Sequence, residues 1–275
     1  EHLDHYSGLD VIRRSFTEFV NKVPFYGAAI LCLDDENVQG ILPDVKRRTI
    51  TYGCNTQADF RIADVSCGDF STHFTLHHRG MSLGEFNLNI PGKHNVMNAT
   101  AAAAVATELG VAPDVVREGL AMFAGVDRRF QVKGQAGGVT VIDDYGHHPT
   151  EIRATLQAAR SCRADRIHVL FQPHRFSRTF HLMDDFARAF HQADRVYVLD
   201  IYAASEKPIE GVTSEALVDR LRQFGHKGVE HVASLPIGVE RVCANVAPGD
   251  LAITLGAGSV SQASEQILEA LRRRT

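Results

Sequence analysis

The first part of the chain places its hydrophobic residues at two different spacings. Ile12, Phe16 and Phe19 recur at the spacing of a helix, and the apolar run at residues 28–33 predicts a buried strand. Between residues 49 and 90, short extended stretches are separated by glycine and polar turns, which predicts mostly antiparallel strands. This region is therefore expected to hold a sheet and at least one helix.

An alanine-rich stretch follows the predicted strands. Residues 98–109 have high helix propensity and are followed by Gly110, a residue that commonly ends helices. Residues 113–123 predict a second, shorter helix. After Gly125 the pattern changes, so we expect a domain boundary near residue 126.

In the rest of the chain, apolar strands alternate with amphipathic helices. Strands are predicted at residues 139–142, 167–171, 196–199 and 251–255, and helices are marked by Ile152/Leu156/Ala159, Leu182/Phe186/Phe190, Leu217/Leu221, Val239/Val242 and Ile267/Leu271. This alternation is typical of a parallel sheet covered by helices on both faces. The predicted fold class is thus α/β, with a domain of mixed or antiparallel strands over residues 1–126 and a Rossmann-like, doubly wound domain over residues 127–275.

Composition and charge narrow the classes of function. With 44% apolar and 23% charged residues and no apolar run long enough to cross a bilayer, the chain is expected to be globular, with no membrane role. A net charge of -4 argues against nonspecific binding to nucleic acid. The five cysteines are scattered and favour a reducing cytoplasm over a disulfide framework. The chain starts without a methionine or a signal peptide, so we expect it to be processed or cut.

Ligands of open parallel sheets bind beyond the carboxyl ends of the strands, so polar residues after each predicted strand are informative. Residues 143–149, Asp-Asp-Tyr-Gly-His-His-Pro, crowd two carboxylates, a phenol and two imidazoles before a helix. A solvated loop with a proline at the helix start is the simpler alternative. The functional interpretation is favoured because so many titratable groups rarely gather at one strand end by chance.

Two further strand ends are candidates for anion sites. In residues 172–179, Arg175 and Arg178 are three apart and can share one face of a helical turn, where guanidinium groups suit a carboxylate or phosphate; a surface salt-bridge turn explains them equally well. Residues 255–259, Leu-Gly-Ala-Gly-Ser, could hold a phosphate before a helix or form a tight structural turn. The dinucleotide-binding fingerprint is incomplete there because residue 261 is serine.

Polar residues in three other places have competing explanations. Asn95 and Asn98 lie at the predicted helix start, where an N-cap explains one of them and recognition of a base or ribose competes for the other. Residues 128–130, Arg-Arg-Phe, are expected on the connection between domains, as a solvated linker or as a cation that meets a phosphate. Residues 2–5 contain two histidines that either bind a metal or are merely exposed.

These motifs, in this order, resemble the signature of the Mur ligase family. They are Glu-His-Leu-Asp-His-Tyr at residues 1–6, Gly-Lys-His-Asn-Val-Met-Asn-Ala at 92–99, Arg-Arg-Phe at 128–130, Asp-Asp-Tyr-Gly-His-His-Pro-Thr-Glu at 143–151 and Phe-Gln-Pro-His-Arg-Phe-Ser-Arg-Thr at 171–179. The last two are most similar to the versions found in the family member that adds L-alanine. The resemblance extends over essentially the whole chain.

The resemblance implies that different domains bind different substrates. Family members have an N-terminal domain for a UDP-sugar, a central ATPase domain and a C-terminal Rossmann-like domain that brings in the amino acid. It implies that residues 1–126 are the C-terminal part of the central domain. The phosphate-binding motif Gly-x-x-x-x-Gly-Lys-Ser/Thr does not occur in these 275 residues. We therefore expect the isolated chain to lack ligase activity.

The activity implied is ATP-driven amide formation between UDP-N-acetylmuramate and L-alanine through an acyl phosphate, with Mg²⁺, in peptidoglycan biosynthesis. Positioning and neutralisation of phosphoryl charge dominate such chemistry. By the resemblance, His2 is a magnesium ligand, and Asn95 and Asn98 contact the adenine of ATP. His94 is a neighbour of the nucleotide, and Asp144 contacts its ribose.

The resemblance also assigns the amino-acid site and one phosphate contact. Arg129 approaches the terminal phosphate of ATP. His147, Arg175 and Arg178 gather the carboxylate of L-alanine, and Tyr145 lines the same region. These assignments make Arg129, His147, Arg175 and Arg178 the candidate catalytic residues.

Three alternatives remain open. Within the family, a recycling ligase attaches a preformed tripeptide to the same sugar nucleotide, and its acceptor pocket should be larger. The chain could instead be a module that binds amino acid or nucleotide without turnover, which a comparison of ATP turnover with a longer chain would reveal. A nicotinamide-dependent dehydrogenase is disfavoured because the glycine loop at residues 256–258 lies far from a first strand.

Overall fold

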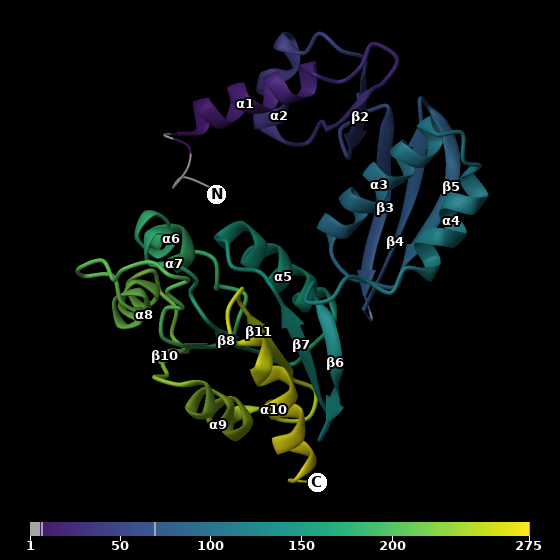
Figure 1. The fold of residues 1–275 in the computed structure, drawn as a ribbon. Coiled ribbons are helices and arrows are strands. Elements are labelled where there is room, and N and C mark those ends of the chain that lie inside the picture. Colours follow the sequence, from purple (N-terminus) through teal and green to yellow (C-terminus); the bar gives the residue numbers. More distant parts are fainter. Residues whose placement is uncertain (1–5, 7, 69, 275) are drawn as a thin grey trace. The chain divides into compact units, whose positions relative to one another are not determined.

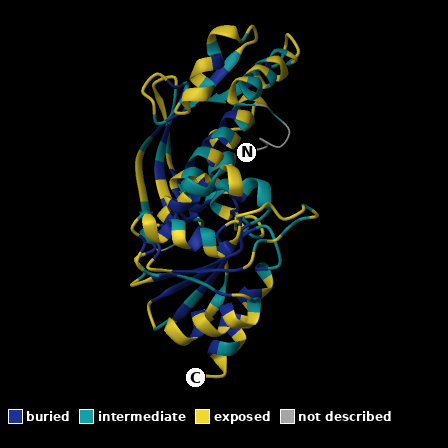
Figure 2. Ribbon diagram, turned by 90° about the vertical axis from the view of Figure 1, so that its left-hand side faces the viewer, coloured by how far each residue is buried: buried dark blue, intermediate teal, exposed yellow. Residues whose placement is uncertain are grey.

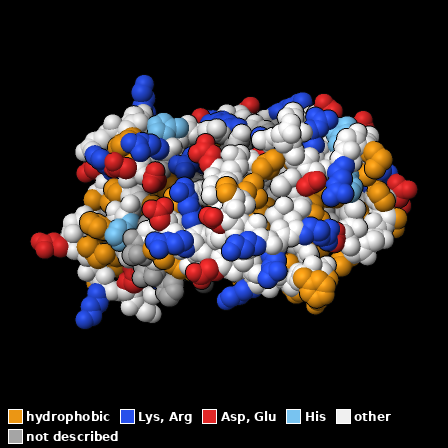
Figure 3. Space-filling view, turned by 90° about the horizontal axis from the view of Figure 1, so that it is seen from above, with side chains coloured by type: hydrophobic (Ala, Val, Ile, Leu, Met, Phe, Trp, Pro, Cys, Tyr) orange, Lys and Arg blue, Asp and Glu red, His pale blue; other side chains and the backbone are white. Residues whose placement is uncertain are grey.

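The computed structural model describes residues 6, 8–68 and 70–274. The chain divides into two compact units, Glu1–Ala124 and Gly125–Thr275. Each has its own sheet and its own hydrophobic core. Among the described residues, no helix has the length and apolar character needed to cross a membrane. Positive and negative side chains are interspersed over the face shown in Figure 3.

The first unit is built on a five-stranded sheet with the order β1-β2-β3-β4-β5. The strands are β1 Ala29–Cys32, β2 Thr49–Gly53, β3 Phe60–Gly68, β4 Ser71–His78 and β5 Met81–Leu88. β3, β4 and β5 pair antiparallel, as the sequence predicted. β2 is the exception to this mostly antiparallel pattern, because it runs parallel to both β1 and β3. The sheet is therefore mixed.

Two helices, α3 and α4, cover one face of this sheet (Figure 1). α3 spans Lys93–Glu108 and α4 spans Pro113–Met122. α3 begins five residues before the predicted start at residue 98, after Gly92, whose φ of 105° is strained for other residues. Val96, in its first turns, is fully buried against the strands, so packing overrides the modest helix propensity of the residues around it.

The N-terminal helix and two short helices complete the first unit. They are α1 Leu9–Asn21, α2 Glu36–Ile41 and the 3₁₀ helix η1 Leu42–Asp44. α1 confirms the helix predicted from the spacing of Ile12, Phe16 and Phe19. Phe16 and Phe19 are nevertheless 57% and 70% exposed. Helical spacing thus identified the helix, although these two rings are not part of a core among the described residues.

The second unit contains a six-stranded sheet with the order β10-β9-β8-β11-β7-β6, in which only the pairing of β6 with β7 is antiparallel. Its strands are β6 Gln131–Ala136, β7 Val139–Asp144, β8 Ile167–Phe171, β9 Arg195–Val198, β10 Val229–His231 and β11 Leu251–Leu255. Its helices are α5 Pro149–Ser161, α6 Phe176–His181, α7 Met183–Ala187, α8 Ser214–Gln223, α9 Leu235–Asn245 and α10 Ser261–Arg272. The α/β fold class is confirmed.

Four elements of this unit differ from the sequence expectations. β6 and β10 were not predicted, because β6 is a mostly polar edge strand and β10 has only three residues. The helix marked by Leu182, Phe186 and Phe190 is shorter than expected: α7 covers only Met183–Ala187, Leu182 is its N-cap, and Phe190 lies beyond its end. β7 continues to Asp144, two residues beyond its predicted end.

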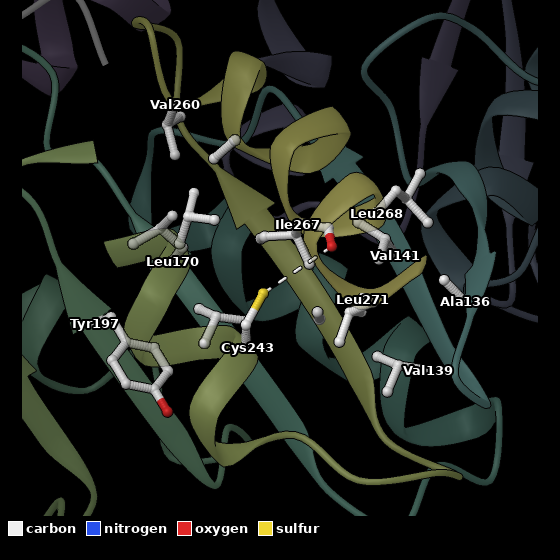
Figure 4. Close-up of a cluster of buried hydrophobic side chains, with 14 of the residues drawn as sticks. Ala136, Val139, Val141, Leu170, Tyr197, Cys243, Val260, Ile267, Leu268 and Leu271 are labelled. Carbon is white, nitrogen blue, oxygen red and sulfur yellow. Dashed lines mark hydrogen bonds between the residues drawn. The ribbon is translucent and has the colours of Figure 1, made fainter. Parts of the chain in front are cut away.

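Helices cover both faces of the second sheet. α9 and α10 pack on one face through the cluster of buried side chains in Figure 4, where Leu170 and Tyr197 meet Cys243 and Ile267. On the other face, the ring of Phe171 lies 5.7 Å from that of Phe186 in α7. Successive residues of a strand point to opposite faces, so Leu170 and Phe171 anchor the two layers. The central strands β8 and β11 are accordingly buried along their whole length, and the strands of this sheet include dark blue segments in Figure 2.

Candidate functional site

The side chains best suited to catalysis or ligand binding lie at the carboxyl ends of β7, β8, β9 and β11 in the second unit. These four strands are parallel, so their carboxyl ends converge on one edge of the sheet. This is the edge at which ligands of doubly wound folds bind.

The two aspartates at the end of β7 are buried parts of the fold rather than loop residues. Asp143 is 2% exposed and accepts hydrogen bonds from Arg128 Nε at 3.0 Å and from Thr254 Oγ1 at 2.6 Å. Asp144 is 4% exposed, and its two oxygens accept the backbone N–H groups of Phe130 and Gly146 at 2.8 and 2.6 Å. Burial raises the pKa of Asp144, and these hydrogen bonds oppose that effect. Its contact with a ribose stays a prediction.

The segment at residues 128–130 is folded into the second unit, so the solvated-linker interpretation is wrong. Phe130 is 4% exposed, and Arg128 donates to the carbonyl oxygen of Gly256 at 2.7 Å. The guanidinium groups of Arg128 and Arg129 lie 4.8 and 5.7 Å from the centre of the Tyr145 ring. Both cations therefore flank the ring that follows β7.

The start of α5 fixes the histidines that follow β7. His148 is the N-cap, with Nδ1 accepting the backbone N–H of Thr150 at 3.3 Å. Glu151 accepts the N–H groups of His147 and His148 at 3.0 and 3.1 Å, and Arg129 Nη1 contacts its other oxygen at 3.1 Å. Burial raises the pKa of Glu151, but these hydrogen-bond donors outweigh burial and hold the pKa below its usual value. The backbone of His147 is thereby held in one place.

The side chain of His147 is directed by its neighbours. Its Nδ1 lies 3.1 Å from the carbonyl oxygen of Tyr145 and 3.6 Å from Glu151 Oε2. The centre of its ring lies 5.2 Å from that of Tyr145, in an edge-on arrangement. The centre of the His174 ring is 5.9 Å away. The strand ends of β7 and β8 thus bring two imidazoles together.

The arginines after β8 do not share the face of a helical turn. Arg175 is the N-cap of α6 with a φ of 74°, outside the helix, whereas Arg178 lies inside it. Arg178 Nη1 donates to both Nδ1 and the backbone carbonyl of His174, each at 3.1 Å. Burial, followed by the charges of Arg178, His147 and Arg175, lowers the pKa of His174 to about 4.

The segment after β9 contributes two residues that the sequence prediction missed. Tyr202 exchanges backbone hydrogen bonds with Pro173 and Arg175, each 2.8 Å long, and its ring stacks on His174 at 5.5 Å. Glu206 accepts the N–H and the hydroxyl of Ser177 at 3.0 and 2.6 Å and lies 3.7 Å from Arg175 Nη1. They follow the predicted strand at residues 196–199, so the rule applied to the other strand ends would have found them.

Close packing explains the glycines after β11. A Cβ at Gly258 would lie 2.4 Å from Gln172 Oε1 and 3.0 Å from the Tyr202 ring, and one at Gly256 would lie 2.7 Å from the Gln172 carbonyl. Gln172 Oε1 also accepts the N–H of Val260, the N-cap of α10, at 3.1 Å. The tight-turn explanation therefore accounts for this loop without a phosphate.

The candidate nucleotide residues of the first unit lie on α3. Its N-cap is Gly92, so neither asparagine caps the helix. Asn95 donates to the carbonyl of Pro91 at 2.8 Å, and Asn98 is exposed on the side opposite the buried Val96 and Thr100. His94 is partly exposed.

The candidate metal ligand, His2, lies outside the described residues. Within the part of the chain that the structure describes, no three histidine, cysteine, aspartate or glutamate side chains are arranged to hold a metal ion.

Comparison with known families agrees with this arrangement. Residues 1–106 match a model of the Mur ligase middle domain, and residues 128–258 match a model described as Mur ligase, glutamate ligase domain. The chain belongs to the Mur ligase family. In the terms of that family, the arginine and histidine cluster lies in the second matched region, and α3 lies in the first.

Individual relatives of this Mur ligase chain carry one consistent name. The chain is 65% identical over 272 residues to a UDP-N-acetylmuramate–L-alanine ligase of Solibacter usitatus. It is 52% identical over 273 residues to a ligase of the same name from a Geobacter species. Each alignment covers 99% of this chain and 58% or 59% of the relative, so the chain spans little more than half of their length. The crystal structure of UDP-N-acetylmuramate-alanine ligase from Thermotoga maritima has a TM-score of 0.79 and 27% identity, covering 100% of this chain and 58% of that one.

Proposed function

We propose that these residues form part of an ATP-dependent ligase that joins L-alanine to UDP-N-acetylmuramate through an acyl phosphate, in the cytoplasm, during peptidoglycan biosynthesis. The observation that supports this most is the cluster of His147, His174, Arg175 and Arg178 at the sheet edge, combined with relatives of this name at 65% and 52% identity. Guanidinium groups suit the carboxylate of a free amino acid.

The residues of the second unit take the amino-acid side of the reaction. Arg175 and Arg178 bind the carboxylate of L-alanine, and His147 and Tyr145 complete the wall of the site. Arg129, held over Tyr145 by Glu151, balances the charge of the transferred phosphoryl group. Holding the amine close to the acyl carbon supplies much of the acceleration in such a reaction.

The first unit takes the nucleotide. Asn98 presents an exposed amide with both donor and acceptor atoms, which fits the edge of an adenine, and Asn95 and His94 lie beside it on α3. ATP supplies the phosphoryl group that activates the muramate carboxylate. Mg²⁺ belongs to the proposal through His2, which lies outside the described residues; the described residues themselves offer no metal-binding cluster.

The test is phosphate release from ATP by the complete ligase that contains these residues. We expect release to require both UDP-N-acetylmuramate and L-alanine, with the amide product identified by mass. Faster reaction with a preformed tripeptide than with L-alanine would favour the recycling ligase. Binding of both ligands without phosphate release would favour a non-catalytic module. Either result would overturn the proposal.

A further inference from the structure

The segment after β9 is joined to the segment after β8 by backbone hydrogen bonds. Tyr202 donates to the carbonyl oxygen of Pro173 and accepts from the N–H of Arg175, each at 2.8 Å. These bonds form an isolated parallel bridge between His174 and Tyr202, beyond the ends of the strands. The ring of Tyr202 also stacks on His174, with the ring centres 5.5 Å apart. The backbone of Arg175 is therefore fixed by a residue from a different strand end.

Both segments contain backbone conformations that residues other than glycine rarely adopt. The φ angles are 74° at Arg175, 47° at Ala204 and 71° at Ser205, all in the left-handed region. Glu206 follows directly, and its N–H donates to the carbonyl oxygen of Ala203 at 2.9 Å. Such conformations persist only where surrounding contacts impose them. The contacts between the two segments therefore decide how Arg175 is held.

The carboxylate of Glu206 connects the two segments. Its Oε2 accepts the backbone N–H of Ser177 at 3.0 Å, and its Oε1 accepts the Ser177 hydroxyl at 2.6 Å. Oε1 also lies 3.7 Å from Nη1 of Arg175. Burial raises the pKa of Glu206, but the hydrogen bonds from Ser177 and the charge of Arg175 outweigh burial and hold the pKa below its usual value. Glu206 is therefore ionised at pH 7, next to a cation.

This arrangement determines the direction of the Arg175 side chain. The two hydrogen bonds from Ser177 fix the carboxylate of Glu206, so Nη1 of Arg175 lies beside an anion with a defined position. A guanidinium is planar and its five N–H donors form a rigid fork, so a contact at one nitrogen orients the others. The side chain of Arg175 is 39% exposed and would otherwise lose rotamer entropy on binding an anion. Holding the guanidinium in advance reduces that loss.

We infer that Glu206 is a positioning residue of the amino-acid site, which holds the guanidinium of Arg175 in the direction in which Arg175 binds the substrate carboxylate. Glu206 acts through Arg175 and not by contact with the substrate. This inference rests on the proposed function, because it requires Arg175 to bind the carboxylate of L-alanine. The segment after β9 thereby contributes to the affinity for the amino acid.

Glu206→Gln tests this role in the complete ligase. The amide can still form hydrogen bonds with the N–H and the hydroxyl of Ser177, but the charge that attracts Arg175 is removed. We expect KM for L-alanine to rise by about 2- to 5-fold, in line with the modest value of a partly exposed ion pair, while kcat and KM for ATP change little. Glu210→Gln, at an exposed glutamate of the same loop, is the matched control and should change none of the three constants.

A double variant separates positioning from a purely structural role. Because Glu206 acts through Arg175, adding Glu206→Gln to Arg175→Ala should not raise KM for L-alanine beyond the value of Arg175→Ala alone. Ser177→Ala removes the hydroxyl that holds Oε1 of Glu206, so it should raise KM for L-alanine and show the same non-additivity. This variant provides the test if Glu206→Gln has a lower Tm than the wild type.

Two results would overturn the role of Glu206. One is an unchanged KM for L-alanine in both Glu206→Gln and Ser177→Ala. The other is an equal fold increase in this KM with and without the side chain of Arg175, because the effect would then be independent of Arg175. Phosphate release by the wild-type ligase that does not depend on L-alanine would instead disprove the proposed function, and the inference with it. No substitution of Glu206 is involved in that measurement, so the two failures are distinguishable.

Discussion

Among single residues, Arg175 combines a strained backbone with a charged side chain in the candidate site. Its φ of 74° lies in the left-handed region, which an arginine adopts only when surrounding contacts impose it. The contacts are a backbone hydrogen bond to the Tyr202 carbonyl and the nearby carboxylate of Glu206. Such strain is often found at functional positions, where it fixes a side chain in advance.

Arg175→Ala should raise the KM for L-alanine far more than the KM for ATP. Loss of a charge-assisted hydrogen bond costs about 1.5–3 kcal/mol, which corresponds to roughly a 10- to 100-fold change in KM. Steady-state kinetics of the complete ligase would measure both constants. Arg153→Ala, which removes an exposed arginine of α5 in the same unit, is the matched control and should change neither. An unaltered dependence on L-alanine would disprove the carboxylate role of Arg175.

Asn98 permits a second test at this scale, because the structure removes its structural explanation. It lies within α3, is exposed and is not the N-cap. Asn98→Ala should therefore leave Tm unchanged and weaken ATP binding by about 1–3 kcal/mol, the range for a lost polar contact. Calorimetric titration with ATP would measure the affinity, and a thermal scan would measure Tm. A lower Tm with normal ATP affinity would make Asn98 structural. Asn245→Ala, at an exposed asparagine of α9, is the control.

Among the elements, α5 has the most complete N-terminal cap. The sequence contains the elements of a capping box in residues 148–151, with proline at the first helical position, and the structure forms both reciprocal hydrogen bonds. Its N-cap is a histidine, which is an uncommon residue there. The cap also places His147, so stability of the helix and geometry of the site depend on the same glutamate.

Glu151→Gln should destabilise the second unit in a way that depends on pH. The folded pKa of Glu151 is lowered, so its contribution to stability is present above the ordinary value of 4.5 and is lost as pH falls through the folded pKa. At pH 7 we expect a loss of about 1 kcal/mol, as for other N-terminal caps. Urea unfolding at several pH values would measure it. At pH values below the folded pKa of Glu151, the variant and the wild type should converge.

The control for this measurement is Glu265→Gln. The side chain of Glu265 is 75% exposed and lies 3.7 Å from Lys133, a surface pair that contributes little. The free energy of unfolding of Glu265→Gln should equal that of the wild type at every pH. If Glu151→Gln behaves in the same way, the capping box does not stabilise α5.

At the scale of the whole molecule, the two units have separate cores that differ in how they are covered. Helices cover both faces of the second sheet. In the first unit, Phe16, Phe19 and Phe25 are 57%, 70% and 89% exposed among the described residues. Exposed rings contribute less to stability than buried ones. The second unit is therefore expected to be the more stable of the two.

We expect the 275-residue chain to unfold in urea in two steps, with residues 1–124 unfolding first. The chain has no tryptophan, so far-UV circular dichroism and amide hydrogen exchange are the suitable probes. Residues 125–275 expressed alone should fold and should unfold at the midpoint of the second step. One transition in which the amides of both units lose protection together would contradict this prediction.

The sequence predicted most of the fold, because hydrophobic periodicity is a local property. It gave the strands at residues 167–171 and 251–255 with their observed bounds, and the helices α1, α4, α5 and α8 to α10. It missed β6 and β10, whose residues carry no clear alternation, and placed the start of α3 too late. The structure of such elements depends on what they pack against or pair with, and not on the pattern of their own residues alone.

The residue types and motifs of the sequence by themselves determined the family of the chain and which side chains carry chemistry. Only the tertiary structure decided the positions and hydrogen-bond partners of these side chains. Asp144 is engaged by two backbone N–H groups, Arg175 lies outside its helix, and Glu206 joins the cluster from a third strand end. The positions of the His147 and His174 rings likewise depend on contacts with Tyr145 and Arg178. The contacts of Asp144 with Phe130 and of Glu206 with Ser177 join residues 14 and 29 positions apart, so local spacing cannot specify their geometry.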